Sequence, residues 1–302
     1  MKKDCSLIAT IPSLSNMHVV GKIISHPSIA EVRFNTGTRS PYSPLKTVQM
    51  LAEKADFFKK PLWIDLKGRQ LRVAVWADPL YECVELNHPI KVKLPAKMAF
   101  RNGTTVNISS VDGNKVFLMN PPREALGKGQ SVNIIGNTPE ILDDYLTEQD
   151  LAYLEACKQL NVRNIMASFV ENKEDLNVIE DIMGGKVNIC SKIESKKGVI
   201  FAGQSWGFIR CMAARDDLYI ELEGNYKKMM DALKSIIATD PKAICASRIF
   251  TSLERRDAPS LADYEDLEMM YSMGYRRFML CDNVCNYAFD KAMKAWEVFT
   301  SA

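Results

Sequence analysis

The feature that most constrains the fold is a regular alternation of short apolar segments and amphipathic segments. Residues 6–10 (SLIAT), 29–35 (IAEVRFN) and 61–66 (PLWIDL) have the length and composition of buried strands. Helical periodicity follows the first two of them, at 17–25 and 44–57. This order predicts parallel strands that are joined by crossover helices.

The alternation stops after the third strand and resumes later. We expect further strands at 164–169, 186–193, 208–214, 242–247 and 276–281. We expect the intervening helices at 146–160, 173–183, 196–202, 226–238, 260–273 and 287–299. Eight such units come to about 235 residues, close to the ~250 of a closed barrel. The predicted fold is therefore an α/β (β/α)8 TIM barrel, with an open doubly wound sheet as the structural alternative.

The interruption has the pattern of a small all-β domain. Short strands at 104–110 and 115–119 flank Asp112-Gly113, a dipeptide typical of tight hairpins. We predict that residues 73–138 form a β-barrel-like lid domain, inserted after the third strand of a catalytic barrel made by residues 1–72 and 139–302.

Composition excludes several classes of protein. A net charge of +2 gives no electrostatic basis for binding nucleic acid or an anionic membrane. We find neither an apolar run of 18 residues nor a clear signal peptide, so a cytoplasmic location is expected. Eight scattered cysteines in mostly apolar surroundings are typical of reduced, buried thiols. The three histidines form no recognisable constellation, which argues against a histidine triad or a zinc–histidine site.

Charged and polar residues gather where the predicted strands end. The active sites of such barrels lie at the carboxyl ends of the strands. Side chains two residues apart on a strand share a face, so Lys192 and Glu194 should project into one space. The residues in question are Arg33, Asn35, Asp65, Lys67, Arg72, Lys192, Glu194, Arg215, Asp216, Asp217, Ser247, Arg248, Asp282 and Asn283.

These residue types favour a particular chemistry. Glu194 and Asp217 are hard oxygen ligands of the kind that Mg²⁺ or Mn²⁺ prefers. Arg33, Arg72 and Lys192 suit phosphate or carboxylate groups. A hydroxyl at Ser247 could relay a proton. The set favours phosphoryl transfer or the chemistry of an enolate.

Several segments together resemble one family. They are SLIATIPS, VRFNTG, IDLKGRQLR, LTEQDLAYLEACKQLNVRNIMASFV, KIES, MAARDDL and ICASRIFTSL, with RNGTTVNISSVDGNKVFL and LGKGQSVNIIG in the insertion. In this order, and over nearly the whole chain, they are similar to the pyruvate kinase family. The sequence ends at Ala302, so we expect no counterpart of that family's C-terminal regulatory domain.

The resemblance implies a role for each catalytic position. Lys192 would stabilise the transferred phosphoryl group and the enolate oxygen, and Ser247 would lie near the enolate carbon that is protonated. Among the other residues, Arg33, Arg72, Asp216 and Asp217 would face the phosphate and the rest of the substrate, Glu194 and Asp217 would hold Mg²⁺ or Mn²⁺, and Asn35 and Asp65 match monovalent-cation positions.

The departures from the family pattern concern the cation and the substrates. Gly37 stands where the family has a serine of the potassium site, and Gln70 replaces an acidic residue, so we do not carry over a potassium requirement. Arg69, in place of a proline, is instead expected to supply the charge of the ion. Asp216 replaces a glycine, and its charge should weaken binding of a substrate carboxylate by about 1 kcal/mol unless it is paired. On the nucleotide side, Thr38 replaces a histidine, and residues 101–103 differ from the family's lid turn.

Three hypotheses follow. The first is a Mg²⁺-dependent phosphotransferase that acts on phosphoenolpyruvate or a related 2-oxo acid enol phosphate, with ADP or ATP as its nucleotide. The second is a metal-dependent lyase or aldolase that works through a pyruvate enolate without nucleotide. The third is a non-catalytic relative that binds a ligand. A monomer and a homodimer both remain open.

Overall fold

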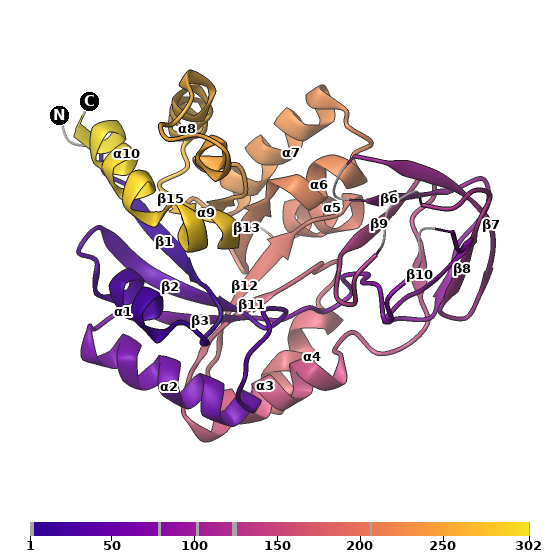
Figure 1. Ribbon diagram of the computed structural model, residues 1–302, viewed down its shortest axis with the longest axis horizontal. Helices are drawn as coiled ribbons and strands as arrows, with labels where there is room; N and C mark the ends of the chain where they lie inside the picture. Colours follow the sequence, from indigo (N-terminus) through magenta and orange to yellow (C-terminus); the bar gives the residue numbers. More distant parts are fainter. Residues whose placement is uncertain (1–2, 78–79, 101–102, 123–125, 206, 302) are drawn as a thin grey trace.

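The computed structural model describes residues 3–77, 80–100, 103–122, 126–205 and 207–301, and within them it confirms the predicted barrel. Parallel strands close into a ring in the order β1-β15-β14-β13-β12-β11-β3-β2 (Figure 1). Because β1 (Ser6–Ile11) pairs with both β2 (Ile29–Asn35) and β15 (Arg277–Met279), the sheet is closed rather than open. The other barrel strands are β3 (Leu62–Asp65), β11 (Asn164–Ala167), β12 (Asn188–Ile193), β13 (Arg210–Ala214) and β14 (Ile244–Ala246).

Helices surround the barrel and connect its strands. They are α1 (Met17–Ser25), α2 (Pro44–Phe57), α3 (Glu148–Gln159), α4 (Glu174–Met183), α5 (Lys196–Gln204), α6 (Arg215–Glu221), α7 (Tyr226–Thr239), the 3₁₀ helix η1 (Thr251–Glu254), α8 (Leu261–Met273), α9 (Asp282–Tyr287) and α10 (Phe289–Ser301). In the part of the chain that the structure describes, no helix combines the length and hydropathy needed to span a bilayer.

The ends of several helices follow directly from their capping residues. The side chains of Thr147 and Ser260 each accept a hydrogen bond from the backbone N–H three residues later. The aspartate at that later position accepts a hydrogen bond from the backbone N–H of the capping residue. Gly184 and Gly274 end α4 and α8 in left-handed conformations, which glycine adopts without steric cost.

Two short helices, α6 and α9, depart from the sequence prediction. Residues 215–217 were expected as a polar strand end, but they form the first turn of α6, immediately after β13. Likewise the last helix was predicted from residue 287, whereas α9 already begins at Asp282 and α10 follows at Phe289. Both helices place acidic side chains in a first turn, where the helix dipole favours negative charge.

The barrel is held by a core on each side of its sheet. The larger cluster fills the layer between strands and helices and includes Phe34, Ile64 and Phe278. A smaller cluster, with Ile8, Trp63 and Met212 among its members, lies on the opposite strand faces and so inside the barrel. Apolar side chains therefore fill the interior of the barrel, and the polar residues gather at the carboxyl ends of the strands.

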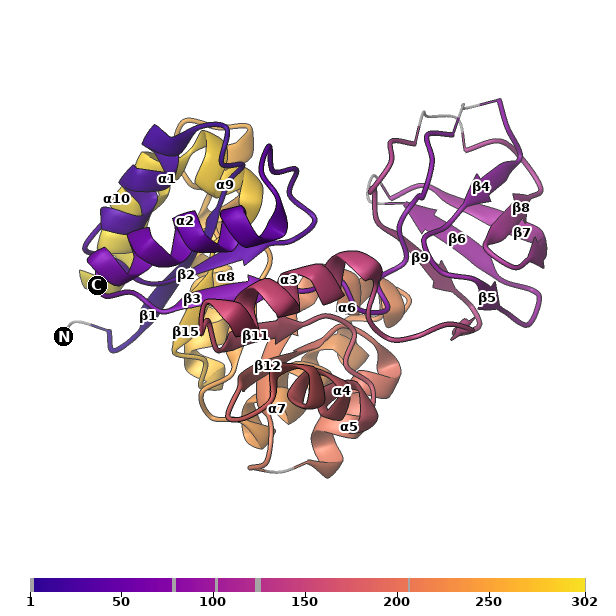
Figure 2. The same ribbon diagram turned by 90° about the horizontal axis from the view of Figure 1, so that it is seen from below.

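The insertion is an antiparallel unit with its own hydrophobic core. Its described strands are β4 (Cys83–Glu85), β5 (Ile90–Lys91), β6 (Lys97–Phe100), β7 (Thr105–Asp112), β8 (Lys115–Leu118), β9 (Val132–Ile135) and β10 (Glu140–Ile141). Figure 2 shows it set to one side of the barrel. The division at residues 72/73 and 138/139 stays a prediction; β10, just beyond the second boundary, pairs with β5. Arg101 and Asn102 of the predicted lid turn lie outside the described residues.

One contact joins the two connections to the insertion. The Asp150 carboxylate, in the first turn of α3, accepts hydrogen bonds from the backbone N–H groups of Lys67 (2.7 Å) and Gly68 (3.0 Å). Gly68 has φ = +50°, and a Cβ atom there would lie 2.6 Å from the carbonyl oxygen of Ser168. The backbone after β3 is therefore fixed, and this also fixes the position of the Lys67 Cα atom, from which its side chain extends.

Candidate active site

A cavity of about 340 Å³ lies at the carboxyl ends of the barrel strands and is shared with the insertion. Gly129, Gln130 and Ser131 line it from the insertion side. The structure brings nearly all the predicted site residues together there: Arg33, Asn35, Arg72, Lys192, Glu194, Asp216, Asp217 and Ser247 are in its wall. Asp65 is fully buried and reaches the cavity through its contacts with Arg33 and Lys192.

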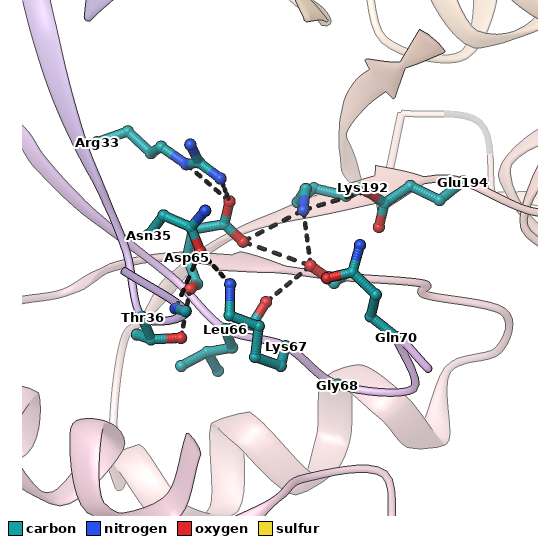
Figure 3. A network of polar contacts seen from close by, with 12 residues as sticks. Arg33, Asn35, Thr36, Asp65, Leu66, Lys67, Gly68, Gln70, Lys192 and Glu194 are labelled. Atoms are coloured by element: carbon teal, nitrogen blue, oxygen red, sulfur yellow. Dashed lines mark hydrogen bonds and ion pairs between the residues drawn. The ribbon is translucent and has the colours of Figure 1, made fainter. Parts of the chain in front are cut away.

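Asp65 orients the two principal cations of the site (Figure 3). The Nε atom of Arg33 donates to Asp65 Oδ2 at 2.8 Å, and Lys192 Nζ lies 3.3 Å from Oδ1. Burial alone would raise the pKa of Asp65, but the charges of Arg33 and Lys192 hold it well below its usual range. Asp65 is therefore an ionised anchor that keeps both cations at the cavity wall.

Lys192 and Glu194 point into the same space, as their spacing predicted. The strand ends at Ile193, and Lys192 Nζ lies 3.2 Å from Glu194 Oε1 and donates to Ser168 Oγ at 2.6 Å. The Phe169 N–H donates to Glu194 Oε2 at 2.8 Å. Burial raises the pKa of Glu194 to about 7 against the opposing charge of Lys192.

Arg33 is held from three sides. Besides Asp65, its guanidinium donates to Thr10 Oγ1 at 3.1 Å and to Asp282 Oδ2 at 3.2 Å. Burial would lower the pKa of Arg33, but Asp65 and Asp282 raise it, so the group keeps its charge. A buried, permanently charged fork suits the binding of a phosphate.

Asp216 and Asp217 lie side by side in α6 but have different partners. Asp217 accepts a hydrogen bond from Gln70 Nε2 at 3.4 Å. Asp216 is exposed, and its Oδ1 accepts from Arg248 Nε at 3.0 Å. The guanidinium of Arg248 also lies 5.1 Å from the ring centroid of Tyr219. The charge that was expected to disfavour a substrate carboxylate is thus paired.

Ser247 follows β14 directly, at a bend where the backbone has an unusual conformation. Ser247 and Arg248 have φ values of +66° and +64°, unusual for residues with a Cβ atom. Arg215 donates to the carbonyl oxygens of Ala246 (3.1 Å) and Ser247 (2.5 Å) and forms a two-point ion pair with Asp266 at 2.7 Å. Arg215 is therefore a positioning residue for Ser247.

The remaining cations differ in how they face the cavity. Arg72 donates to Gln70 Oε1 and to the Gly129 carbonyl at 2.5 Å, so it ties the cavity to the insertion. Lys67 donates to Asn35 Oδ1; burial, and then the charge of Arg72, lower the pKa of Lys67 well below its ordinary value.

The role predicted for Arg69 is wrong. Its guanidinium pairs with Asp175 at 2.5 Å and lies 4.8 Å from the ring centroid of Tyr145. Asp175 lies at the start of α4, so Arg69 is directed away from Asn35 and Asp65. Arg69 therefore contacts α4 through Asp175 rather than the expected cation positions.

Two carboxylates of the cavity, Glu194 and Asp217, have the oxygen-donor chemistry that Mg²⁺ prefers. Among the described residues there is no group of three or more His, Cys, Asp or Glu side chains arranged around one metal position. Mg²⁺ is often held by only one or two carboxylates, with substrate oxygens and water completing its coordination. Glu194 and Asp217 line the same cavity, so they are the two carboxylates that would hold such an ion.

Sequence reasoning missed two uncharged members of the site, Thr10 and Ser168. Both lie at strand ends, and their hydroxyls contact the cations Arg33 and Lys192. Their positions after apolar strand residues were the available signal, but hydroxyl groups at strand ends are common. Asp282 was noted at the end of its strand without a role, and it now pairs with Arg33.

Comparisons with known proteins agree with this architecture. The family model described as "Pyruvate kinase, barrel domain" matches residues 91–289, which is more than half of the chain. A pyruvate kinase of Methanocaldococcus jannaschii is 25% identical over 88% of this chain and 62% of its own length. A pyruvate kinase of Borreliella burgdorferi is 24% identical over 93% of this chain and 64% of its own length. The chain matches only a quarter of the length of "Pyruvate kinase PKLR" of Rattus norvegicus, at 33% identity. These matches, and the barrel with its inserted β domain, show that the chain is a divergent member of the pyruvate kinase family.

Proposed function

We propose that this chain is a Mg²⁺-dependent phosphotransferase that acts on phosphoenolpyruvate or a related enol phosphate of a 2-oxo acid. The observation that carries the proposal is the convergence of Arg33, Lys192, Glu194, Asp217 and Ser247 on one cavity. Cations for a phosphate, a lysine for a developing oxyanion and two carboxylates for a metal are the parts that phosphoryl transfer requires.

The side chains divide the work as follows. Arg33, fixed by Asp65 and Asp282, binds oxygens of the phosphate. Lys192 stabilises the negative charge that develops on the enol oxygen as its bond to phosphorus breaks and the phosphoryl group moves to the acceptor. A proton then reaches the former methylene carbon of the enolate, and Ser247 is placed at the cavity wall to relay it. When bound at Glu194 and Asp217, Mg²⁺ would neutralise charge on the substrate oxygens.

A neighbouring cavity supports a second substrate. It has about 670 Å³ and includes Thr38, Arg39, Tyr42 and Lys128 in its lining. Lys128 precedes Gly129, and Gly37 follows Asn35 by two residues, so the two cavities adjoin along the chain. Two cations and an aromatic ring suit a phosphate-bearing nucleotide, ADP or ATP.

The direct test measures pyruvate and ATP formation from millimolar phosphoenolpyruvate and ADP, with and without Mg²⁺. The proposal expects Mg²⁺-dependent turnover that falls by at least 100-fold in Lys192→Gln, because a transition-state contact is lost. Lys197→Gln, a change at an exposed residue outside the cavity wall, should retain full activity. No turnover above the Lys192→Gln background would contradict the proposal.

Thr38, in place of the family's nucleotide-side histidine, favours one alternative. A lyase or aldolase that works through a pyruvate enolate would use the same lysine and carboxylates without a nucleotide. Exchange of the methyl protons of pyruvate in deuterated water, with Mg²⁺ and without nucleotide, together with no transfer to ADP, would support it over the phosphotransferase.

A further inference from the structure

We infer that the amino group of Lys67 fills the monovalent-cation position beside Asn35 and Asp65, so that this protein neither binds nor needs K⁺ there. The inference concerns occupancy of a site and holds whichever reaction the cavity catalyses. It begins from Figure 3, in which the Lys67 side chain is directed at Asn35.

Three observations place Lys67 in that position. Lys67 is a buried residue with a relative exposure of 5%, so it is not a solvated surface lysine. Its Nζ donates to Asn35 Oδ1, the side-chain oxygen that Asn35 would offer to an ion. The same oxygen also accepts from the Gly37 N–H at 3.0 Å, which fixes the Asn35 amide. The lysine therefore takes up the one side-chain oxygen that Asn35 could offer to a cation.

Gly37 is what makes room for the lysine. A Cβ atom on Gly37 would lie 2.5 Å from both Cε and Nζ of Lys67, closer than atoms can approach. The other neighbour of that Cβ atom would be Asn35 Oδ1 at 3.3 Å. Any residue except glycine at this position would force the end of Lys67 to shift from where it contacts Asn35. The glycine and the lysine therefore act as a pair: one removes a side chain, and the other occupies the space.

The second expected ligand is also engaged. Asp65 already accepts from Arg33 and lies within 3.3 Å of Lys192, so its charge is balanced by protein cations. The amino group of Lys67 donates to an amide oxygen whether it is protonated or neutral. Exclusion of an ion thus follows from occupied space and engaged oxygens and does not require a particular charge on Lys67.

The test is the thermal unfolding of the purified chain in K⁺ and in tetramethylammonium, at equal ionic strength and without substrates. We expect the wild-type Tm to be the same in both salts. Gly37→Ser should displace the end of Lys67 and add a hydroxyl oxygen, so its Tm should rise in K⁺. For a dissociation constant of about 10 mM, the rise at about 100 mM K⁺ is about 3 °C.

Two further variants make the result decisive. Gly37→Ala displaces Lys67 equally but adds no ligand, so its response to K⁺ should be smaller than that of Gly37→Ser. Lys67→Ala, which empties the position without changing the loop, should gain a response to K⁺. A saturable rise of the wild-type Tm with K⁺ would overturn the inference. So would insensitivity to K⁺ in both Gly37→Ser and Lys67→Ala.

Discussion

The guanidinium of Arg215 donates a hydrogen bond to the carbonyl oxygen of Ser247 at 2.5 Å, while its other edge is clamped by Asp266. Arg215 is buried at the start of α6, and Ser247 has the unusual φ of +66°. A residue that follows one strand thus holds the backbone that leaves the next strand. This contact holds the backbone of Ser247 in that conformation.

Arg215→Lys should destabilise the protein and the bend together. A lysine ammonium cannot match the two-point contact with Asp266 and at the same time reach two carbonyl oxygens. We expect the free energy of unfolding to fall by about 1–3 kcal/mol, measured by urea denaturation. Arg255→Lys, at an exposed position, is the matched control. Equal unfolding curves for the two variants would refute the role assigned to Arg215.

The Asp216–Arg248 pair should control how well the cavity accepts an anionic substrate. Arg248→Gln leaves the Asp216 charge uncompensated, and we expect the KM for phosphoenolpyruvate to rise roughly two- to five-fold, as for an exposed ion pair. Adding Asp216→Asn should restore the KM, because the repulsive charge is then gone. A double variant that is as impaired as Arg248→Gln alone would show that Arg248 acts by other means.

Glu221 should make stability fall as pH rises. Burial raises the pKa of this carboxyl to about 7, above the 4.5 expected in the unfolded chain, and Asn133 of β9 donates to it at 3.4 Å. The folded state binds the extra proton, so the stabilisation is complete below about pH 4.5 and is lost as pH rises through about 7. The whole effect is at most about 3 kcal/mol.

Glu221→Gln isolates this effect. The amide cannot ionise, so we expect the variant to be more stable than the wild type at pH 8, with the difference shrinking toward pH 5. Thermal unfolding at several pH values measures it. Parallel pH profiles for the two proteins would show that Glu221 is not the titrating group.

The cysteines should be reduced and mostly unreactive in the folded protein. Cys157, Cys190, Cys211, Cys245 and Cys285 are buried, and all eight thiols are free. Burial raises the pKa of both Cys157 and Cys190 to about 12, which suppresses the reactive thiolate. We expect a thiol reagent to modify at most three sites in native protein and eight in denaturant. Rapid modification of more than three would contradict the buried assignments.

The sequence predicted the barrel well because its strands and most of its helices have local sequence signals. Strand hydrophobicity, the caps at Thr147 and Ser260, and the glycines after α4 and α8 are short-range signals. The helix α6 was not predicted because it starts at Arg215, directly after β13, with no loop to mark its beginning.

The contacts of the site were harder to predict because they depend on the register of neighbouring strands. The pairing of Lys192 with Glu194 follows from spacing within one strand and was predicted. Lys67 follows the end of β3 and contacts Asn35 at the end of β2, and this contact depends on the alignment of Asn35 with Asp65, so no local pattern reveals it. The role given to Arg69 failed because its partner Asp175 is 106 residues away in the sequence, in the first turn of α4.

The clamp that Asp150 places on Lys67 and Gly68 has a consequence for how the chain reaches its native state. The barrel requires β3 to meet β11, yet the insertion lies between them in the chain. Bringing distant segments together costs conformational entropy that grows with the length of free chain between them. Because the insertion has a hydrophobic core of its own, its collapse turns that long tether into a short one. The folded β domain thus shortens the distance between the two ends of the interrupted barrel, and Asp150 from one end then binds the backbone of the other.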